Sequence, residues 1–299
     1  MKQLTIGNSF TLEGKGLHTG VIITLKAHPA PANHGIRIRR TDMENTPEIE
    51  AVADNVMETV RGTVLRIADS QVSTIEHAMA AFYAAGIDNC LFEVNGPEFP
   101  ILDGSARYFV ENIQKVGVVE LDAEKDYITI SELTECIIAT GSNITAYPAD
   151  SLKVDVMIGF NSPVLKEQSA KLDKLEDFNK EISAARTFVF VREIEPLLNM
   201  NLIKGGDLKN AIVIYDKMMS QEALDELTDK LNQKKIDAAD LGYLSGALNF
   251  DNEPARHKLL DVLGDLALTG KPVKGRIIAN YPGHTINTEF AKLLRKKYL

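Results

Sequence analysis

Residues 253–266 have the sequence EPARHKLLDVLGDL and predict an amphipathic helix. At about 100° per residue, one stripe of this helix carries His257, Asp261 and Asp265, each one turn from the next. The opposite side carries the apolar residues Leu259, Leu260, Val262, Leu263 and Leu266. A solvated helix face usually carries Glu and Lys. A histidine and two short aspartates therefore raise the question of what this polar face holds.

Composition and charge restrict the kind of protein. The chain has 299 residues, 44% of them hydrophobic, which suits one large or two smaller domains with their own cores. The formal charge of −9 argues against nucleic acid or an anionic membrane as the main partner, although a local Lys and Arg cluster could hold a small anion. The N-terminus lacks a signal-peptide core, and the longest apolar run, residues 78–87, is too short to span a bilayer. With Cys90 and Cys136 each in a strand-like run, we expect a reduced cytoplasmic protein without stable membrane insertion and without a cysteine-based zinc site.

Strand and helix patterns alternate along the first half of the chain. The predicted strands span 3–12, 20–27, 36–40 and 90–94, the predicted helices span 73–86 and 106–117, and a glycine-rich turn covers 14–20. A charged stretch, 119–128, then leads into a new strand over 128–140. We place a domain boundary at this stretch, which gives domains 1–124 and 125–299.

The end of the second half repeats the order of elements at the end of the first. A helix with His257 near its start leads to a strand over 276–280, a Gly/Pro loop over 281–287 and a final helix. Residue identity between the halves is slight, so the duplication rests on element order. The predicted fold is α+β, with two similar domains that each layer a β-sheet on helices. His77 and His257 would occupy corresponding, facing places in them.

The motif Ser73-Thr74-Ile75-Glu76-His77 has two interpretations. Ser73 as N-cap with Glu76 three residues later is the pattern of a capping box, and His77 could be a core histidine with a satisfied hydrogen bond. Alternatively, Glu76 and His77 carry chemistry. The motif alone does not decide between them.

The predicted helix over 253–266 also has two interpretations. His257 and Asp261, at i and i+4, could share a hydrogen bond on a wet face, or could project together as two ligands of one metal. Asp265 is harder to explain on a wet face, because repeated Asp disfavours a helix interior. With His77 the set becomes two imidazoles and a carboxylate, which leaves a fourth tetrahedral position for water, and Glu76 could act as base. No HExxH motif is present, which argues against an ordinary zincin.

Two further stretches carry weaker signals. In Tyr281-Pro282-Gly283-His284-Thr285, the glycine could let a loop present His284, although an exposed loop histidine explains the pattern as well. The stretch ARTF, residues 185–188, has no signature of its own.

Taken together, the chain resembles the zinc-dependent UDP-3-O-acyl-N-acetylglucosamine deacetylases over essentially its whole length. The matching stretches occur in the family's order: GKGLHTG (14–20), STIEH (73–77), PILDGSA (100–106), GFNSPVL (159–165), ARTF (185–188), KGGDLKNAIV (204–213), EPARHKLLDVLGDL (253–266) and GHTINT (283–288).

The resemblance assigns roles to individual residues. It implies that Zn²⁺ is held by His77, His257 and Asp261. It implies catalytic roles for Glu76, His284, Asp265 (bonded to His284), Thr187 (near the reacting carbonyl) and Lys258 (toward substrate). We predict further substrate contacts at Phe160, Phe188, Leu198, Lys204 and Ala211. In this interpretation the short polar face of the 253–266 helix turns inward, to zinc in an interdomain cleft.

The implied reaction is removal of the N-acetyl group from UDP-3-O-(3-hydroxyacyl)-N-acetylglucosamine, with release of acetate, the committed step of lipid A biosynthesis. Either His284 or Glu76 would protonate the leaving amine. A non-catalytic nucleotide-sugar-binding protein and a zinc amidohydrolase of another acylated sugar are the alternatives. We expect a βαβ-like insertion over 188–215, with a helix at 194–202, to form a passage for the acyl chain. A fused C-terminal β-hydroxyacyl-ACP dehydratase is the expected partner domain in a longer chain.

Overall fold

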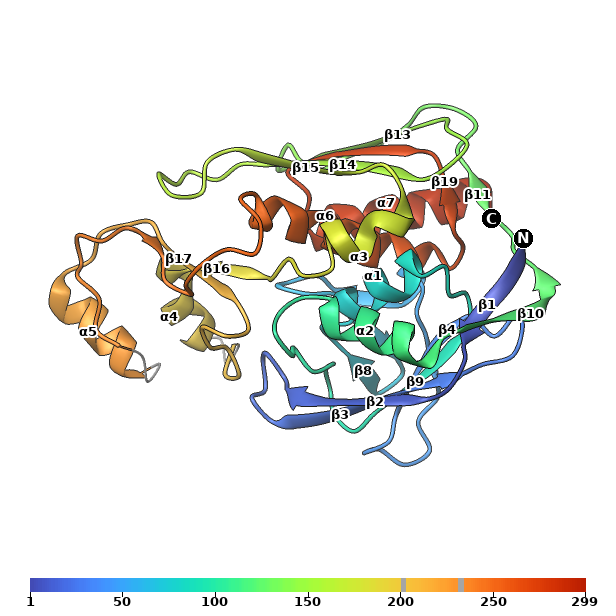
Figure 1. Ribbon diagram of the computed structural model, residues 1–299, viewed down its shortest axis with the longest axis horizontal. Coiled ribbons are helices and arrows are strands. Elements are labelled where there is room, and N and C mark those ends of the chain that lie inside the picture. The colour runs from blue at the N-terminus through green and yellow to red at the C-terminus, as the bar shows by residue number, and fades with distance from the viewer. Residues whose placement is uncertain (200–202, 231–233) are drawn as a thin grey trace.

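The computed structural model describes the chain except for residues 200–202 and 231–233, and it contains both helices and sheets. Its largest parts are two five-stranded sheets with helices between them (Figure 1). The first sheet has the order β2 (Phe10–Lys15), β3 (Ile22–Pro29), β9 (Cys90–Val94), β4 (Ile36–Arg40) and β5 (Ile49–Glu50). The second has the order β12 (Thr134–Ile137), β13 (Asn143–Tyr147), β20 (Arg276–Asn280), β14 (Lys153–Ile158) and β15 (Gln168–Leu172).

The two sheets have the same topology. Numbered by their order along the chain within each sheet, the strands lie in the spatial order first, second, fifth, third, fourth in both. Each sheet has one parallel pair, β9 with β4 and β20 with β14, and its other neighbours are antiparallel. In each half a helix precedes the fifth strand and another follows it: α1 (Glu76–Ala84) and α2 (Arg107–Val116), then α6 (Glu253–Leu266) and α7 (His284–Tyr298).

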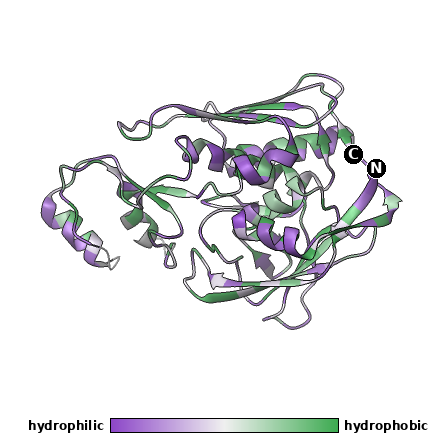
Figure 2. Ribbon diagram, viewed as in Figure 1, coloured by the Kyte–Doolittle hydropathy of each residue, from purple (hydrophilic) through white to green (hydrophobic). Residues whose placement is uncertain are grey.

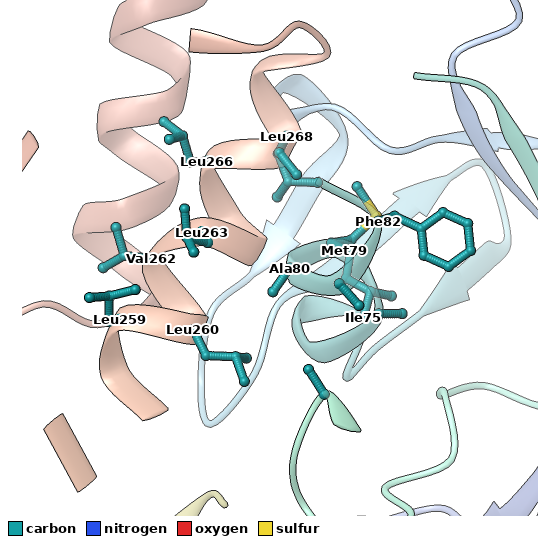
Figure 3. Close-up of a cluster of buried hydrophobic side chains, with 14 of the residues drawn as sticks. Ile75, Met79, Ala80, Phe82, Leu259, Leu260, Val262, Leu263, Leu266 and Leu268 are labelled. Atoms are coloured by element: carbon teal, nitrogen blue, oxygen red, sulfur yellow. The ribbon is translucent and has the colours of Figure 1, made fainter. Parts of the chain in front are cut away.

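Helices α1 and α6 pack against each other in the middle of the molecule. Apolar side chains of both helices belong to one buried cluster, among them Met79 and Phe82 of α1 and Leu260 and Leu263 of α6 (Figure 3). The backbones approach closely at Gly264, where a Cβ atom would lie 2.2 Å from the Glu76 carbonyl oxygen. This contact places the first turn of α1 beside the polar stripe of α6.

Helix α6 is buried on nearly every side. Both its leucine-rich side and the stripe of His257, Asp261 and Asp265 are inaccessible to solvent, and within the helix only Arg256 and Lys258 are partly exposed. A buried polar stripe requires partners for each of its groups, because an unpaired buried charge is costly.

Short elements complete the fold. β1 (Lys2–Ile6) pairs with β10 (Val118–Glu124), β11 (Ile128–Thr129) with β19 (Val273–Lys274), and β7 (Val64–Ile67) lies between β6 (Val56–Glu58) and β8 (Ser70–Val72). The chain also forms the short helix α3 (Phe178–Glu181). Three short 3-10 turns occur at Ala53–Asn55, Leu175–Asp177 and Ala267–Thr269. Among the described helices, none combines the length and apolar character needed to cross a membrane.

The segment 188–243 projects from the sheets and helices (Figure 1). It contains β16 (Phe188–Phe190), α4 (Val191–Asn199), β17 (Ile212–Tyr215), α5 (Gln221–Lys230) and β18 (Gly242–Tyr243). β16 and β17 pair in parallel, as a βαβ unit requires. These strands are hydrophobic, whereas α5 is mostly hydrophilic (Figure 2). A separate cluster of buried apolar residues, including Ile194, Val213 and Leu224, forms the core of this segment.

Several predicted boundaries are wrong. The strand expected over 3–12 is two strands, β1 and β2, because the chain leaves its pairing with β10 before it joins the first sheet. The charged stretch after residue 118 is itself strand β10, and the strand expected over 128–140 is divided into β11 and β12. The helix expected at 194–202 begins at Val191, since it follows β16 directly, and residues 200–202 lie outside the described part of the chain.

Candidate metal centre and active site

Three potential ligands meet where α1 contacts α6. His77 lies in the first turn of α1, and His257 and Asp261 lie one turn apart on α6. One ligand atom from each lies within 4.8 Å of the others, and all three residues are buried. The ring centroids of His77 and His257 are 5.1 Å apart, and the rings lie edge to face.

The chemistry of these groups fits a metal ion. Among the described residues, Oδ1 of Asp261 has no hydrogen-bond partner although it is buried, and it lies 3.4 Å from Nε2 of His257. Nδ1 of His257 donates to the carbonyl of Ala185 at 3.0 Å, which leaves Nε2 free as a ligand. Such an outer hydrogen bond fixes the ring and its tautomer in many metal sites. Two nitrogen donors and one carboxylate oxygen suit zinc.

Burial and charge keep the ligands in the protonation states that a metal needs. Burial, with the neighbouring His257, lowers the pKa of His77 to about 3, so its imidazole is neutral. Burial also lowers the pKa of His257. Burial would raise the pKa of Asp261, but Lys258 and the histidines outweigh it and hold that pKa below its usual range. Nζ of Lys258 donates to Oδ2 of Asp261 at 2.7 Å.

Glu76 is the first residue of α1 and points into the same site. Its carboxylate accepts a hydrogen bond from the Thr63 backbone N–H at 3.3 Å. Burial raises the pKa of Glu76 to about 7; the cation of His284 opposes this shift, and the carboxylates of Asp261 and Asp265 add to it. A group with a pKa near neutrality is suited to both accept and release a proton.

The capping-box interpretation of this motif is wrong. The N-cap of α1 is Ile75, with no side-chain capping bond, and Glu76 does not reach back to Ser73. Thr74 has a left-handed backbone, with φ of 57°, so the chain turns between Ser73 and the helix. The carboxylate of Glu76 is therefore free for the site.

His284 begins α7 and lies opposite Glu76. It is not an exposed loop histidine, because Gly283 is the N-cap and the His284 side chain is only 10% exposed. Nδ1 donates to Oδ2 of Asp265 at 2.8 Å, and Nε2 lies 3.9 Å from Glu76 Oε1 and 3.9 Å from Asp261 Oδ2. Burial alone would lower the pKa of His284, but the surrounding carboxylates, Asp265 first, raise it to about 9. The imidazolium is therefore stable at neutral pH.

A pocket lies beside Thr187, and the empty space in and in front of it, open solvent included, is about 730 Å³. Its lining is mostly apolar and comes from the 14–20 turn, from Arg61 and from the projecting segment 188–243, including Phe188 and Ala211. The projecting segment is attached to the turn by backbone hydrogen bonds, from Lys204 N–H to the His18 carbonyl and from Gly205 N–H to the Leu17 carbonyl.

Two of the other predicted substrate contacts, Phe160 and Lys204, adjoin residues that line this pocket. Phe160 packs edge to face on Phe188, with 5.6 Å between ring centroids, and is 37% exposed. The backbone N–H of Lys204 donates to the carbonyl of His18, which lines the pocket. Leu198 lies in α4, and its side chain is outside the described part of the structure.

Several residues that support the site were not predicted from the sequence. The hydroxyl of Thr63 donates to Asp265 Oδ1 at 2.5 Å, and Nδ2 of Asn287 donates to Asp265 Oδ2 at 2.9 Å. Glu253, fully buried, accepts hydrogen bonds from the Arg186 backbone and guanidinium, and this pair fixes the irregular segment that carries Ala185 and Thr187 against α6. Only the spacing of Glu253 before His257 could have suggested such a role.

Comparison with known proteins identifies the family. Residues 3–239 and 232–296 match the family described as UDP-3-O-acyl N-acetylglycosamine deacetylase. The chain belongs to this family. The UDP-3-O-acyl-N-acetylglucosamine deacetylase of Myxococcus xanthus is 38% identical over 98% of this chain and 85% of its own length.

Other members of the deacetylase family are longer. The "Bifunctional enzyme LpxC/FabZ" of Bacteroides thetaiotaomicron is 56% identical over 99% of this chain and 65% of its own length. The protein of the same name from Porphyromonas gingivalis is 53% identical and is covered over 64% of its length. The chain thus spans about two thirds of these bifunctional relatives.

Proposed function

We propose that this chain hydrolyses the N-acetyl group of UDP-3-O-(3-hydroxyacyl)-N-acetylglucosamine and releases acetate, the committed step of lipid A biosynthesis. The observation that carries the proposal is the convergence of Glu76 and His284 on the three potential ligands, in a member of the deacetylase family. A non-catalytic sugar-nucleotide-binding protein would have no need for two buried acid–base groups whose pKa values are both raised.

His77, His257 and Asp261 would hold Zn²⁺, whose charge when bound activates water and polarises a carbonyl oxygen. Two atoms of the described residues support this assignment: Oδ1 of Asp261, which accepts no hydrogen bond from them, and Nε2 of His257, which is left for a metal because Nδ1 donates to Ala185. Lys258 would balance the charge of Asp261 and contact the substrate from the rim of the site, where its side chain is 21% exposed.

Glu76 and His284 would divide the proton transfers. Glu76 would take a proton from the attacking water, for which a pKa of about 7 is suited. His284, kept cationic by Asp265, would stabilise the developing oxyanion and protonate the leaving amine. The hydroxyl of Thr187 would donate a hydrogen bond to the same oxyanion. In the alternative route, Glu76 would pass the proton that it took from water to the leaving amine.

The apolar pocket beside Thr187 would receive the acyl chain. Its lining by Ala211 and other residues of the βαβ unit supports the predicted passage, because each methylene removed from water contributes about 0.8 kcal/mol. Phe160, Phe188 and Lys204, at the edge of this pocket, would contact the substrate, and Leu198 stays a prediction.

We also propose the division into domains 1–124 and 125–299, with zinc in the cleft between them and 188–215 as an insertion. The identical topology of the two five-stranded sheets supports it. The names of the bifunctional relatives support a fused dehydratase in a longer chain. The cytoplasmic location stays a prediction.

One experiment tests the function. Purified protein would be analysed for zinc and incubated with the UDP-linked substrate, and released acetate would be measured before and after chelation. We expect about one zinc per chain, acetate release, and loss of release on chelation that added zinc restores. Zinc binding without acetate release would favour a binding protein. Acetate release only from another acylated sugar would favour a different amidohydrolase.

A further inference from the structure

The segment 59–63, between β6 and β7, connects the two sides of the candidate active site. At one end the hydroxyls of Thr59 and Thr285 are 2.8 Å apart. At the other end Thr63 contacts groups from both α1 and α6. Between them, a Cβ atom at Gly62 would lie 3.2 Å from Oε1 of Glu76, so the backbone passes directly over that carboxylate.

Thr63 is fully buried and contacts three residues of the candidate active site. Its backbone N–H donates to Oε2 of Glu76 at 3.3 Å, and its hydroxyl donates to Oδ1 of Asp265 at 2.5 Å. The hydroxyl oxygen also lies 3.3 Å from Nδ1 of His284. One residue thus contacts the proposed base, the proposed acid and the carboxylate that orients the acid.

The hydroxyl has a specific effect on Asp265. Oδ2 of that carboxylate accepts from His284 and Asn287, at 2.8 and 2.9 Å, and among the described residues only Thr63 donates to Oδ1. Without the hydroxyl, Oδ1 would be buried beside an apolar group and the carboxylate could rotate about its Cβ–Cγ bond. Rotation would move the acceptor of the His284 ring and with it Nε2.

We propose that Thr63 is a positioning residue of the reaction: its hydroxyl locks the Asp265 carboxylate that orients His284, while its backbone N–H holds Glu76. The proposal rests on the proposed function, since it concerns the geometry of the two proton-transfer groups. It assigns Thr63 no contact with the substrate and no part in holding the metal.

The test compares Thr63→Val, which keeps the shape and backbone N–H but removes the hydroxyl, with Thr63→Ser, which keeps the hydroxyl. We expect Thr63→Val to lower kcat by roughly 10- to 100-fold, the usual scale for loss of an outer hydrogen-bond partner, with unchanged KM and zinc content. Thr63→Ser should restore most of kcat. A residue that only stabilises the fold would change the melting temperature and leave kcat per zinc-loaded site intact.

Thr5→Val is the matched control. Thr5 is also buried, and its hydroxyl donates to the Asn89 carbonyl at 2.8 Å and accepts from the Ala30 N–H at 3.0 Å, away from the site. It should lower the melting temperature without lowering kcat. If Thr63→Val does not fold, Thr63→Ala replaces it, because it places no methyl group against the carboxylate.

Two results would overturn the inference. One is a Thr63→Val enzyme whose kcat per zinc-loaded site equals that of the wild type or of Thr5→Val. The other is a parallel loss of kcat and zinc, which would make Thr63 part of the metal site. Failure of the proposed function is recognised separately, because the wild-type chain itself would then release no acetate, and the inference would fall with it.

Discussion

Replacing Gly264 with alanine should disturb both the stability of the protein and its metal centre. The new Cβ would lie 2.2 Å from the Glu76 carbonyl oxygen, and atoms of this kind do not approach closer than about 3.0 Å. The obstacle is helix backbone rather than a flexible side chain, so α1 and α6 would have to separate by about 0.8 Å.

Two opposing contributions determine the size of the effect. Alanine is a better helix former than glycine by about 1 kcal/mol, which favours the variant. Overpacking of a close contact costs typically about 1–3 kcal/mol, and a contact between two backbones belongs at the upper end. We therefore expect the free energy of unfolding to fall by about 2 kcal/mol, measured by denaturant titration.

The metal centre gives a second readout. His77 follows Glu76 directly, whereas His257 and Asp261 are on the opposing helix, so separation of the helices changes the spacing of the ligands. Ligand distances in metal sites are held to roughly 0.2 Å, and zinc affinity should fall measurably in a chelator competition. Gly242→Ala is the control, because a Cβ there meets no atom of the described part of the chain within 4 Å. A Gly264→Ala protein with wild-type stability and zinc affinity would refute the reasoning.

Four other variants test the site and the pocket. His257→Ala should lose bound zinc and acetate release together, by metal analysis and activity assay; normal zinc and turnover would contradict the ligand assignment. Glu76→Ala should keep zinc and lower kcat by roughly 10²- to 10⁴-fold, the contribution of a general base, and His284→Ala should also impair turnover without releasing metal; undiminished kcat in either would remove that residue from the mechanism. Ala211→Trp, in the pocket lining, should raise KM for long-chain substrates more than for short-chain ones with zinc retained, and equal effects would show a structural role only.

The sequence by itself placed the chain in an α+β class and in its family, and both are confirmed. It also showed that His257, Asp261 and Asp265 share one stripe of a helix. This was possible because the period of an α-helix is fixed by local backbone geometry, so residues one turn apart lie together wherever the helix packs. Local patterns singled out Glu76 and His284 but also allowed a purely structural interpretation of each, and the family motifs assigned them catalytic roles.

Other features depended on tertiary contacts. The spacing of Ser73 and Glu76 could not show that they form no capping box. That follows from the left-handed turn at Thr74, which separates Ser73 from the start of the helix. Nothing near Thr63 in the chain suggests its bond to Asp265, which lies 202 residues away. The αα contact at Gly264, which brings His77 to the stripe of α6, likewise joins distant segments. Periodicity determines which side chains share a face, but which faces meet depends on the packing of the whole chain.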